Sequence, residues 1–153
     1  MPLNPVVIPS SYQTNRQDLD DALEAIMNAF IASNSYAIVR KFWHELPATL
    51  AGEGPFVAVA DVQETIRHTE GLRITLFTGS MYYVDWITDP IEYNTRVNLF
   101  ADQMRDLFTA NPTITNRGLL QQTGFQTGEL SQGNLRFGAP QLLFTYNVQE
   151  GRS

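Results

Sequence analysis

The sequence predicts an α+β fold: a mainly antiparallel sheet with two principal helices packed on one face, in a single domain. Two segments place apolar residues at helical spacing, and several others alternate apolar and polar residues as strands do. No linker or internal repeat divides the 153 residues, and a chain of this length buries roughly 68–70% of its unfolded surface. We therefore place an extended N-terminal arm at residues 1–13 and one domain at residues 14–150.

The first helix is expected to begin at Thr14, which forms a capping box with Gln17, and to end near Asn34. Prolines within the first eleven residues exclude a helix there, which predicts the arm. The first turns should contain three acids favoured by the helix dipole: Asp18, Asp20 and Asp21. One apolar face should pack on the sheet: Leu19, Leu23, Ile26, Met27, Phe30 and Ile31.

The second helix has several start signals around Asp89. The carboxylate of Asp89 can accept hydrogen bonds from free amides of the first turn, while Pro90 occupies the first helical position and Glu92 the third. The pair Asn111-Pro112 predicts the end, because proline disfavours a helical residue before it. A stripe at helical spacing predicts the buried face: Val97, Phe100, Ala101, Met104, Leu107 and Phe108.

Extended segments account for much of the remaining chain. Gly79-Ser80 interrupt one alternating segment, so its two halves should form a hairpin, and residues 127–133 should be a loop. In the last segment every second residue is apolar from Leu142 to Val148, which predicts one buried face. The expected strands are residues 36–46, 56–62, 72–77, 81–87, 119–125 and 135–148.

Composition limits the classes of function. The net charge of −6 argues against a phosphate-binding groove as the main function. Because the chain has no cysteine, it can form neither a disulfide nor a thiolate nucleophile nor a cysteine-based zinc site. It has no N-terminal secretion signal and no apolar run of about 18 residues, so we expect a soluble protein.

Candidate catalytic and metal-binding residues are few. Either histidine, His44 or His68, could bind zinc or relay a proton with a central acid such as Asp61 or Glu64. Their spacing is not that of a metal-binding helix such as H-E-x-x-H. Capping or solvated positions explain the other central acids: Glu70, Asp85, Asp89 and Glu92. We expect no enzyme activity, no catalytic site, no cofactor and no metal.

Two groups of residues are candidates for a subunit or partner interface. Tyr82 and Tyr83 are adjacent on a strand and face opposite sides, so at least one should meet solvent or a partner, beside Asp85 and Trp86. The second group lies where the last strand begins. There Gly138 and Pro140 should mark a bulge or an edge, and Arg136 could pair with an acid of the next subunit. The interface candidates are Tyr82, Tyr83, Asp85, Trp86, Arg136, Gly138 and Pro140.

The order of these elements resembles that of the tail terminator proteins of long-tailed bacteriophages. The likeness covers most of the chain and includes a short first helix, a strand pair, a long second helix and a final strand. The segments that carry it are residues 18–23, 72–77, 83–86, 97–104, 110–114 and 142–148.

The resemblance implies a homohexameric ring in the virion that caps the tail tube and joins it to the head-side neck. One face of the ring would contact the tail tube protein and the other the head-completion or connector protein. DNA would pass through the lumen without specific binding, and no membrane would be involved. Such a ring has no enzyme activity and assembles in the host cytoplasm.

Two alternatives stay open at this point. One is another neck or tail-completion component. The other belongs to a different class: a small ligand-binding or catalytic α+β domain that uses His44 or His68 with the central acids.

Overall fold

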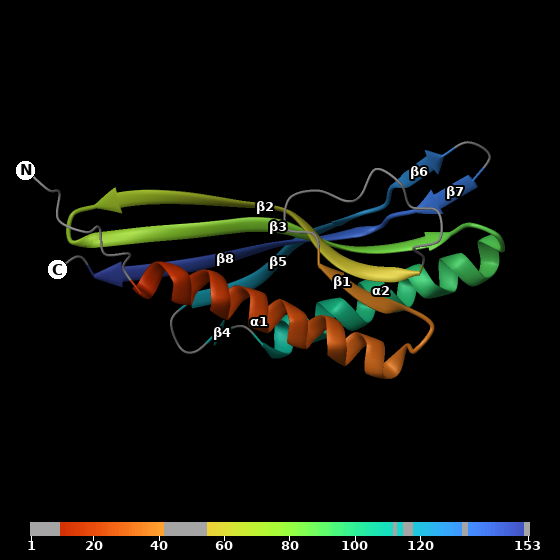
Figure 1. Ribbon diagram of the computed structural model, residues 1–153, viewed down its shortest axis with the longest axis horizontal. Coiled ribbons are helices and arrows are strands. Elements are labelled where there is room, and N and C mark those ends of the chain that lie inside the picture. The colour runs from red at the N-terminus through yellow and green to blue at the C-terminus, as the bar shows by residue number, and fades with distance from the viewer. Residues whose placement is uncertain (1–9, 42–54, 112, 115–117, 133–134, 152–153) are drawn as a thin grey trace, which may run out of the picture.

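The computed structural model describes residues 10–41, 55–111, 113–114, 118–132 and 135–151 (Figure 1). They form an α+β fold, as the sequence predicts. In chain order the elements are α1 (Ser10–Ser33), β1 (Ile38–Lys41), β2 (Phe56–Thr69), β3 (Leu72–Trp86), α2 (Pro90–Ala110), β4 (Thr113–Ile114), β5 (Gly118–Gln126), β6 (Glu129–Gln132), β7 (Leu135–Gly138) and β8 (Gln141–Gly151).

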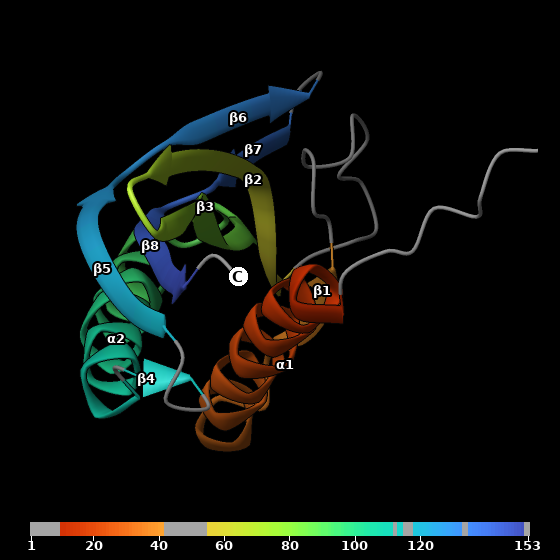
Figure 2. The same cartoon turned by 90° about the vertical axis from the view of Figure 1, so that its left-hand side faces the viewer.

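The sheet has the strand order β1-β2-β3-β8-β5-β4, and β7 pairs with both the end of β3 and β6. Strands β2, β3, β8 and β5 are antiparallel to their neighbours, whereas β1 runs parallel to β2. The sheet curls, and both helices lie on its concave side (Figure 2). No helix among the described residues is long and apolar enough to cross a bilayer.

The core lies between the helices and the concave face of the sheet. Phe100 of α2 contacts Phe30 of α1 edge-on and stacks on Tyr83 of β3, each with ring centroids 5.8 Å apart. Phe108 stacks on Phe144 of β8 at 5.9 Å. The expected apolar stripe of α2 is confirmed, since its four buried residues are Val97, Phe100, Met104 and Phe108.

The ends of α2 agree with the sequence signals. Asp89 is the N-cap, and its Oδ1 accepts hydrogen bonds from the amides of Ile91 (3.0 Å) and Glu92 (3.4 Å). At the other end, the Asn111 amide donates to the Phe108 carbonyl (3.2 Å), and the Asn111 side chain donates to the Leu107 carbonyl (2.8 Å). Local capping groups therefore determine both ends of this helix.

The start of α1 differs from the prediction. The helix begins at Ser10, so the proposed arm boundary at residue 13 is wrong, and residues 1–9 lie outside the described residues. Proline limits the residue before it more than those after it, so Pro9 does not prevent a helix from Ser10. The three expected first-turn aspartates consequently lie beyond the first turn, and Gln17 donates to Asp21 (2.7 Å). The end at Ser33 is as predicted.

The predicted hairpin at Gly79-Ser80 is also wrong. β3 runs without a break from Leu72 to Trp86, and it forms its hairpin with β2, through Glu70 and Gly71. Gly71 has a φ of 72°, which glycine adopts without strain. Gly79 instead lies against a ring: a Cβ there would stand 2.8 Å from Cζ of Phe144.

The last predicted strand is divided in two. β7 and β8 are separate strands around residues 139–140, and the expected loop contains β6. Gly138 pairs with Asp85 of β3 on one side and with Glu129 of β6 on the other, so it is not at an edge. The Pro140 carbonyl accepts a hydrogen bond from the Tyr83 amide (3.1 Å). The predicted alternation from Leu142 to Val148 is confirmed, because every second residue of this segment is buried: Leu142, Phe144, Tyr146 and Val148.

Two early strands also differ in length from the prediction. β1 covers only part of the expected segment, and residues 42–54 lie outside the described residues. β2 continues to Thr69, beyond the expected end at Val62. Its pairing with β3 shifts between Ala60 and Gln63, where Asp61 has a φ of 59°. Beyond this irregularity residues 63–69 are polar except for Ile66, so no apolar pattern marked the continuation of the strand.

Candidate functional site

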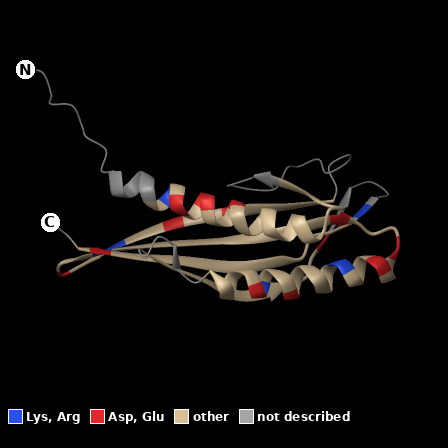
Figure 3. Ribbon diagram, turned by 90° about the horizontal axis from the view of Figure 1, so that it is seen from below, with Lys and Arg blue, Asp and Glu red and all other residues tan. Residues whose placement is uncertain are grey.

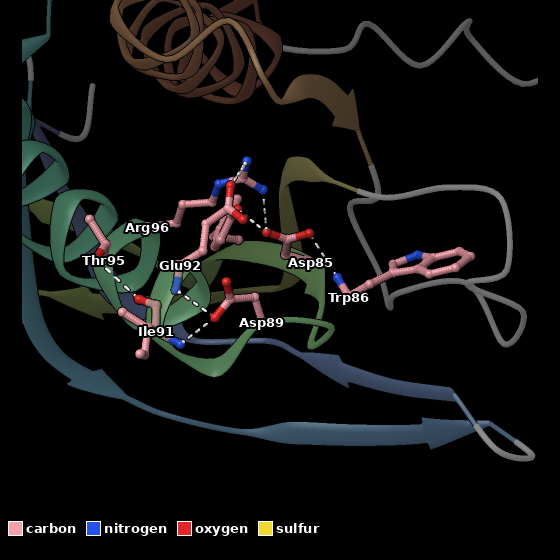
Figure 4. Close-up of polar contacts among 8 residues, drawn as sticks. Asp85, Trp86, Asp89, Ile91, Glu92, Thr95 and Arg96 are labelled. Carbon is pink, nitrogen blue, oxygen red and sulfur yellow. Dashed lines mark hydrogen bonds and ion pairs between the residues drawn. The ribbon is translucent and has the colours of Figure 1, made fainter.

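The most polar buried position of the fold lies where β3 ends and α2 begins. Asp85 is only 5% exposed, and it borders a cleft of about 210 Å³. Figure 4 shows Arg96 reaching from α2 toward Asp85, while the Trp86 ring points away from this contact. The cleft is lined by Pro55, Asp85, Trp86, Thr88, Asp89, Glu92, Tyr93 and Arg96.

The Asp85 carboxylate accepts three hydrogen bonds. Its Oδ2 receives the Tyr83 hydroxyl (2.5 Å) and Nη1 of Arg96 (3.1 Å), and its Oδ1 receives the Trp86 amide (2.8 Å). A buried carboxylate needs such partners, because leaving it without them would forfeit its hydration. The geometry therefore explains how β3 can hold an acid beside the core.

Arg96 joins three parts of the chain. Besides Asp85, its guanidinium donates to Glu92 through Nη2 (2.7 Å), one turn earlier on α2. The same group lies 4.3 Å from the centre of the Tyr36 ring, a cation–π arrangement. The planar guanidinium with several donors suits a position that must serve two carboxylates and a ring together. Arg96 thus links β3, α2 and the segment before β1.

The tyrosines around this pair stay protonated over a wide pH range. Burial, and then the hydrogen bond to Asp85, raise the pKa of Tyr83 far above its usual value of 10.0. Burial also raises the pKa of Tyr36 and brings the pKa of Tyr93 to about 12. These hydroxyls are therefore donors near neutral pH rather than bases. The cluster is suited to stabilising the junction between β3 and α2.

The histidine hypothesis finds no assembled site in the structure. His44 lies outside the described residues, and His68 is exposed and pairs with Arg73 across the β2–β3 ladder. Asp61, seven positions earlier on the same strand, is roughly 23 Å away. Asp61 accepts a hydrogen bond from the Tyr82 hydroxyl (2.6 Å). Among the described residues, no group of three or more His, Asp or Glu side chains could hold a metal ion.

The first expected interface group does not form one exposed patch. Tyr83 is fully buried and Asp85 nearly so, because both face the helices. Tyr82 is half-buried on the other face of β3, where it packs on a smaller cluster with Val84. Trp86 is 36% exposed and contacts Phe137 edge-on at 5.5 Å. Only Tyr82 and Trp86 of this group present surface to a partner.

The second expected group is likewise mostly internal. Gly138 and Pro140 are buried, and a Cβ on Gly138 would stand 1.6 Å from the Tyr93 hydroxyl oxygen, so packing requires glycine there. Arg136 is exposed and donates two hydrogen bonds to Glu129 of the same chain, at 2.7 and 3.0 Å. If Arg136 paired with a neighbouring subunit, it would have to share or give up its hydrogen bonds to Glu129.

Sequence reasoning missed the open edges of the sheet. Among the described residues, β1 pairs with β2 only over residues 56–59, and β4 pairs with β5 only over residues 118–119. No strand of the described part of the chain pairs with the outer edges of residues 61–69 and 120–126, which can therefore accept another strand. The sequence held no local signal for them, because the position of a strand at the edge of a sheet follows from the tertiary fold.

No known protein family and no curated protein matches this chain. The class is therefore defined by the fold alone: an α+β protein whose four central strands are all antiparallel and whose helices cover one face.

Proposed function

We propose that this protein is a structural component of a long-tailed bacteriophage: a tail terminator that forms a ring, caps the tail tube and joins it to the head-side neck. The proposed ring has six copies, with the tail tube protein on one face and the head-completion or connector protein on the other. The protein acts in the virion and catalyses no reaction.

The observation that carries this proposal is the open sheet. A strand edge with free amides and carbonyls can pair with another chain, and this sheet has such an edge on each side. When the two edges of one chain meet edges of identical neighbours, each copy binds two others, and a suitable rotation closes a ring. The architecture thus supports self-assembly.

The order of elements supports the same assignment. A first helix, a long strand pair, a second helix and a final strand follow one another as in the resemblance drawn from the sequence, although α1, with 24 residues, is longer than α2, with 21, and is not the short helix expected. The polar cluster at Asp85 fits a structural role, because its hydrogen bonds join β3 to α2.

The charge distribution is compatible with passage of DNA. The central parts of three strands, residues 74–84, 118–126 and 141–149, contain no charged residue. Among the described residues, charged side chains lie mainly on the helices, along β2 and toward the ends of the other strands, and most of the sheet is uncharged (Figure 3). An uncharged sheet surface lacks the cations that bind phosphate groups, so DNA would not be retained on it.

The test is the location of the protein in phage particles. In the phage that encodes this chain, cryo-electron microscopy should show one ring of it at the head-proximal end of the tail. A deletion mutant should accumulate unjoined heads and tails, and the gene supplied in trans should restore infectious particles. Presence in infected cells together with absence from virions would refute the proposal.

A matched variant separates assembly from catalysis. His44→Ala combined with His68→Ala should complement the deletion about as well as the unchanged gene, because the proposed role needs neither histidine. A folded double variant that fails to complement would favour the ligand-binding or catalytic alternative.

A further inference from the structure

The two open edges belong to the outermost long strands of the central sheet. Residues 61–69 of β2 and residues 120–126 of β5 each pair on one side only among the described residues. Seven residues of strand span roughly 23 Å, which is long enough for a stable ladder. Each edge contains one irregularity, at Asp61 and at Thr123, where the strand bends locally, and the remaining residues of each edge are regular strand.

Neither edge contains the two residue types that most strongly prevent pairing with other chains, proline and lysine. Natural proteins protect exposed edges with proline or lysine, and neither residues 61–69 nor residues 120–126 contain one. The β5 edge carries no charge at all, and the β2 edge carries Asp61, Glu64 and Arg67. Pairing β2 with β5 therefore brings no like charges face to face.

Strand direction determines how two copies can combine. Because β2, β3, β8 and β5 alternate in direction, β2 and β5 run opposite ways within one chain. Two copies in the same orientation, side by side, then place β2 of one antiparallel to β5 of the next. An odd number of central strands would have made this contact parallel.

In a two-fold contact between two β2 edges, the facing charges are less well matched. Glu64 and Arg67 are an odd number of positions apart, so they point to opposite faces of the sheet. Residues directly opposite each other across an antiparallel ladder share a face. Glu64 of one copy therefore cannot stand opposite Arg67 of the other, and the register that places Asp61 opposite Arg67 also places the two copies of Glu64 opposite each other.

We infer that the β2 edge of one copy pairs antiparallel with the β5 edge of the next, so that the central sheet continues from subunit to subunit around a closed ring. This inference rests on the proposed function only in its assumption that the chain forms a ring. The helices of every copy then lie on the same side of the continuous sheet, as they do within one chain.

Disulfide trapping tests the contact directly, because the chain has no cysteine of its own. Gln63, Thr65 and Arg67 on β2 and Gln121 on β5 are exposed and share the sheet face away from the helices. Gln121→Cys should be combined in turn with Gln63→Cys, Thr65→Cys or Arg67→Cys. On oxidation at least one pair should give a ladder of covalent oligomers that ends at the ring.

Matched controls define what would overturn the inference. Gln121→Cys with Asn28→Cys, which is exposed on α1, should give no ladder. Each single cysteine variant should stay uncrosslinked, since one cysteine forms a dimer only across a two-fold contact. Crosslinking by the single variants, or no crosslinking by any of the three pairs, would overturn the inference.

Edge lysines provide a second test, in which the single substitutions do not depend on register. Thr65→Lys or Gln121→Lys should weaken assembly at least tenfold in native mass measurements over a concentration series, with an unchanged circular dichroism spectrum. Asn28→Lys should have no such effect, and Thr65→Lys combined with Gln121→Glu should assemble better than Thr65→Lys alone. An unmodified chain that stays monomeric at every concentration would overturn the inference.

The outcomes are independent of those for the proposed function. Crosslinked rings from a protein that is absent from virions would retain the interface and reject the phage role. A ring in virions whose subunits do not crosslink through β2 and β5 would support the phage role and reject the proposed interface.

Discussion

The ion pairs Asp85–Arg96 and Glu129–Arg136 both join an arginine to a carboxylate, through one hydrogen bond in the first pair and two in the second, but they have different surroundings. The shortest contact is 3.1 Å in the first and 2.7 Å in the second. The side chains of the first pair are 8% and 26% exposed, whereas those of the second are 44% and 59% exposed. Water and salt screen the exposed pair, so the shorter distance does not imply the larger contribution. Burial decides which of the two pairs the fold needs.

The largest expected effect lies in the core on which the buried pair rests. Phe100→Ala should lower the free energy of unfolding by about 3–5 kcal/mol, because it leaves a cavity beneath Tyr83 and Phe30. Denaturant titration measures this, with Leu99→Ala as the control, since Leu99 is adjacent and 38% exposed. A cost below about 1 kcal/mol for Phe100→Ala would place this face of α2 outside the core.

The comparison of the two pairs is tested by truncating one member of each. Asp85→Ala should cost about 1.5–3 kcal/mol, because Arg96 and the Tyr83 hydroxyl lose a charged partner beside the core. Arg136→Ala should leave the melting temperature close to that of the unchanged protein, since the carboxylate of Glu129 stays in contact with water when Arg136 is removed. Equal losses in thermal melts would show that burial does not distinguish the pairs.

A smaller effect is expected at the start of α2. Asp89→Ala removes the acceptor of two first-turn amides and should cost about 1 kcal/mol. Asp102→Ala is the matched control, because Asp102 is an exposed acid within the same helix, 3.9 Å from Arg105. If both variants lose the same stability in urea titrations, the cap contributes no more than a surface charge.

The smallest effect concerns alkaline pH. Burial, and then the hydrogen bond to Asp61, raise the pKa of Tyr82 from 10.0 to about 12. The unfolded chain therefore ionises first, so the contribution of Tyr82 is complete below pH 10 and is lost as the pH rises toward about 12. Over this range the unchanged protein should lose more stability than Tyr82→Phe, as measured by urea titrations at fixed pH values. If the two proteins lost the same stability over this range, the raised pKa of Tyr82 would be contradicted.

The parts of the fold that the sequence predicts correctly have local causes. The start of α2 depends on Asp89 and Pro90, and its end on Asn111, all of which act within one helical turn. The buried face of β8 follows from simple alternation. Signals of this kind require no knowledge of the rest of the chain.

Some errors concern residues whose surroundings come from distant parts of the chain. Gly79 looked like a turn because its partner, Phe144, is far away in sequence. The error at Pro9 is local instead, because proline restricts the residue before it and the helix begins at the residue after it.

The candidate site was predicted less well than the fold. Tyr83 and Asp85 were interface candidates but are buried, and Arg96, which donates a hydrogen bond to Asp85, was not among the predicted site residues. The spacing of Glu92 and Arg96, one helical turn apart, was a usable signal for this pair. The spatial meeting of Arg96 with Asp85 and Tyr36 follows only from the tertiary fold.

The glycines that lie beneath aromatic rings have a consequence for how this chain can evolve. A Cβ would collide with the ring of Phe144 at Gly79, of Tyr146 at Gly118 and of Tyr93 at Gly138. Each glycine and its ring therefore form one steric unit, in which a larger residue at one position requires a smaller residue at the other. Among related sequences, these three pairs should change together or not at all, even though their members are far apart along the chain.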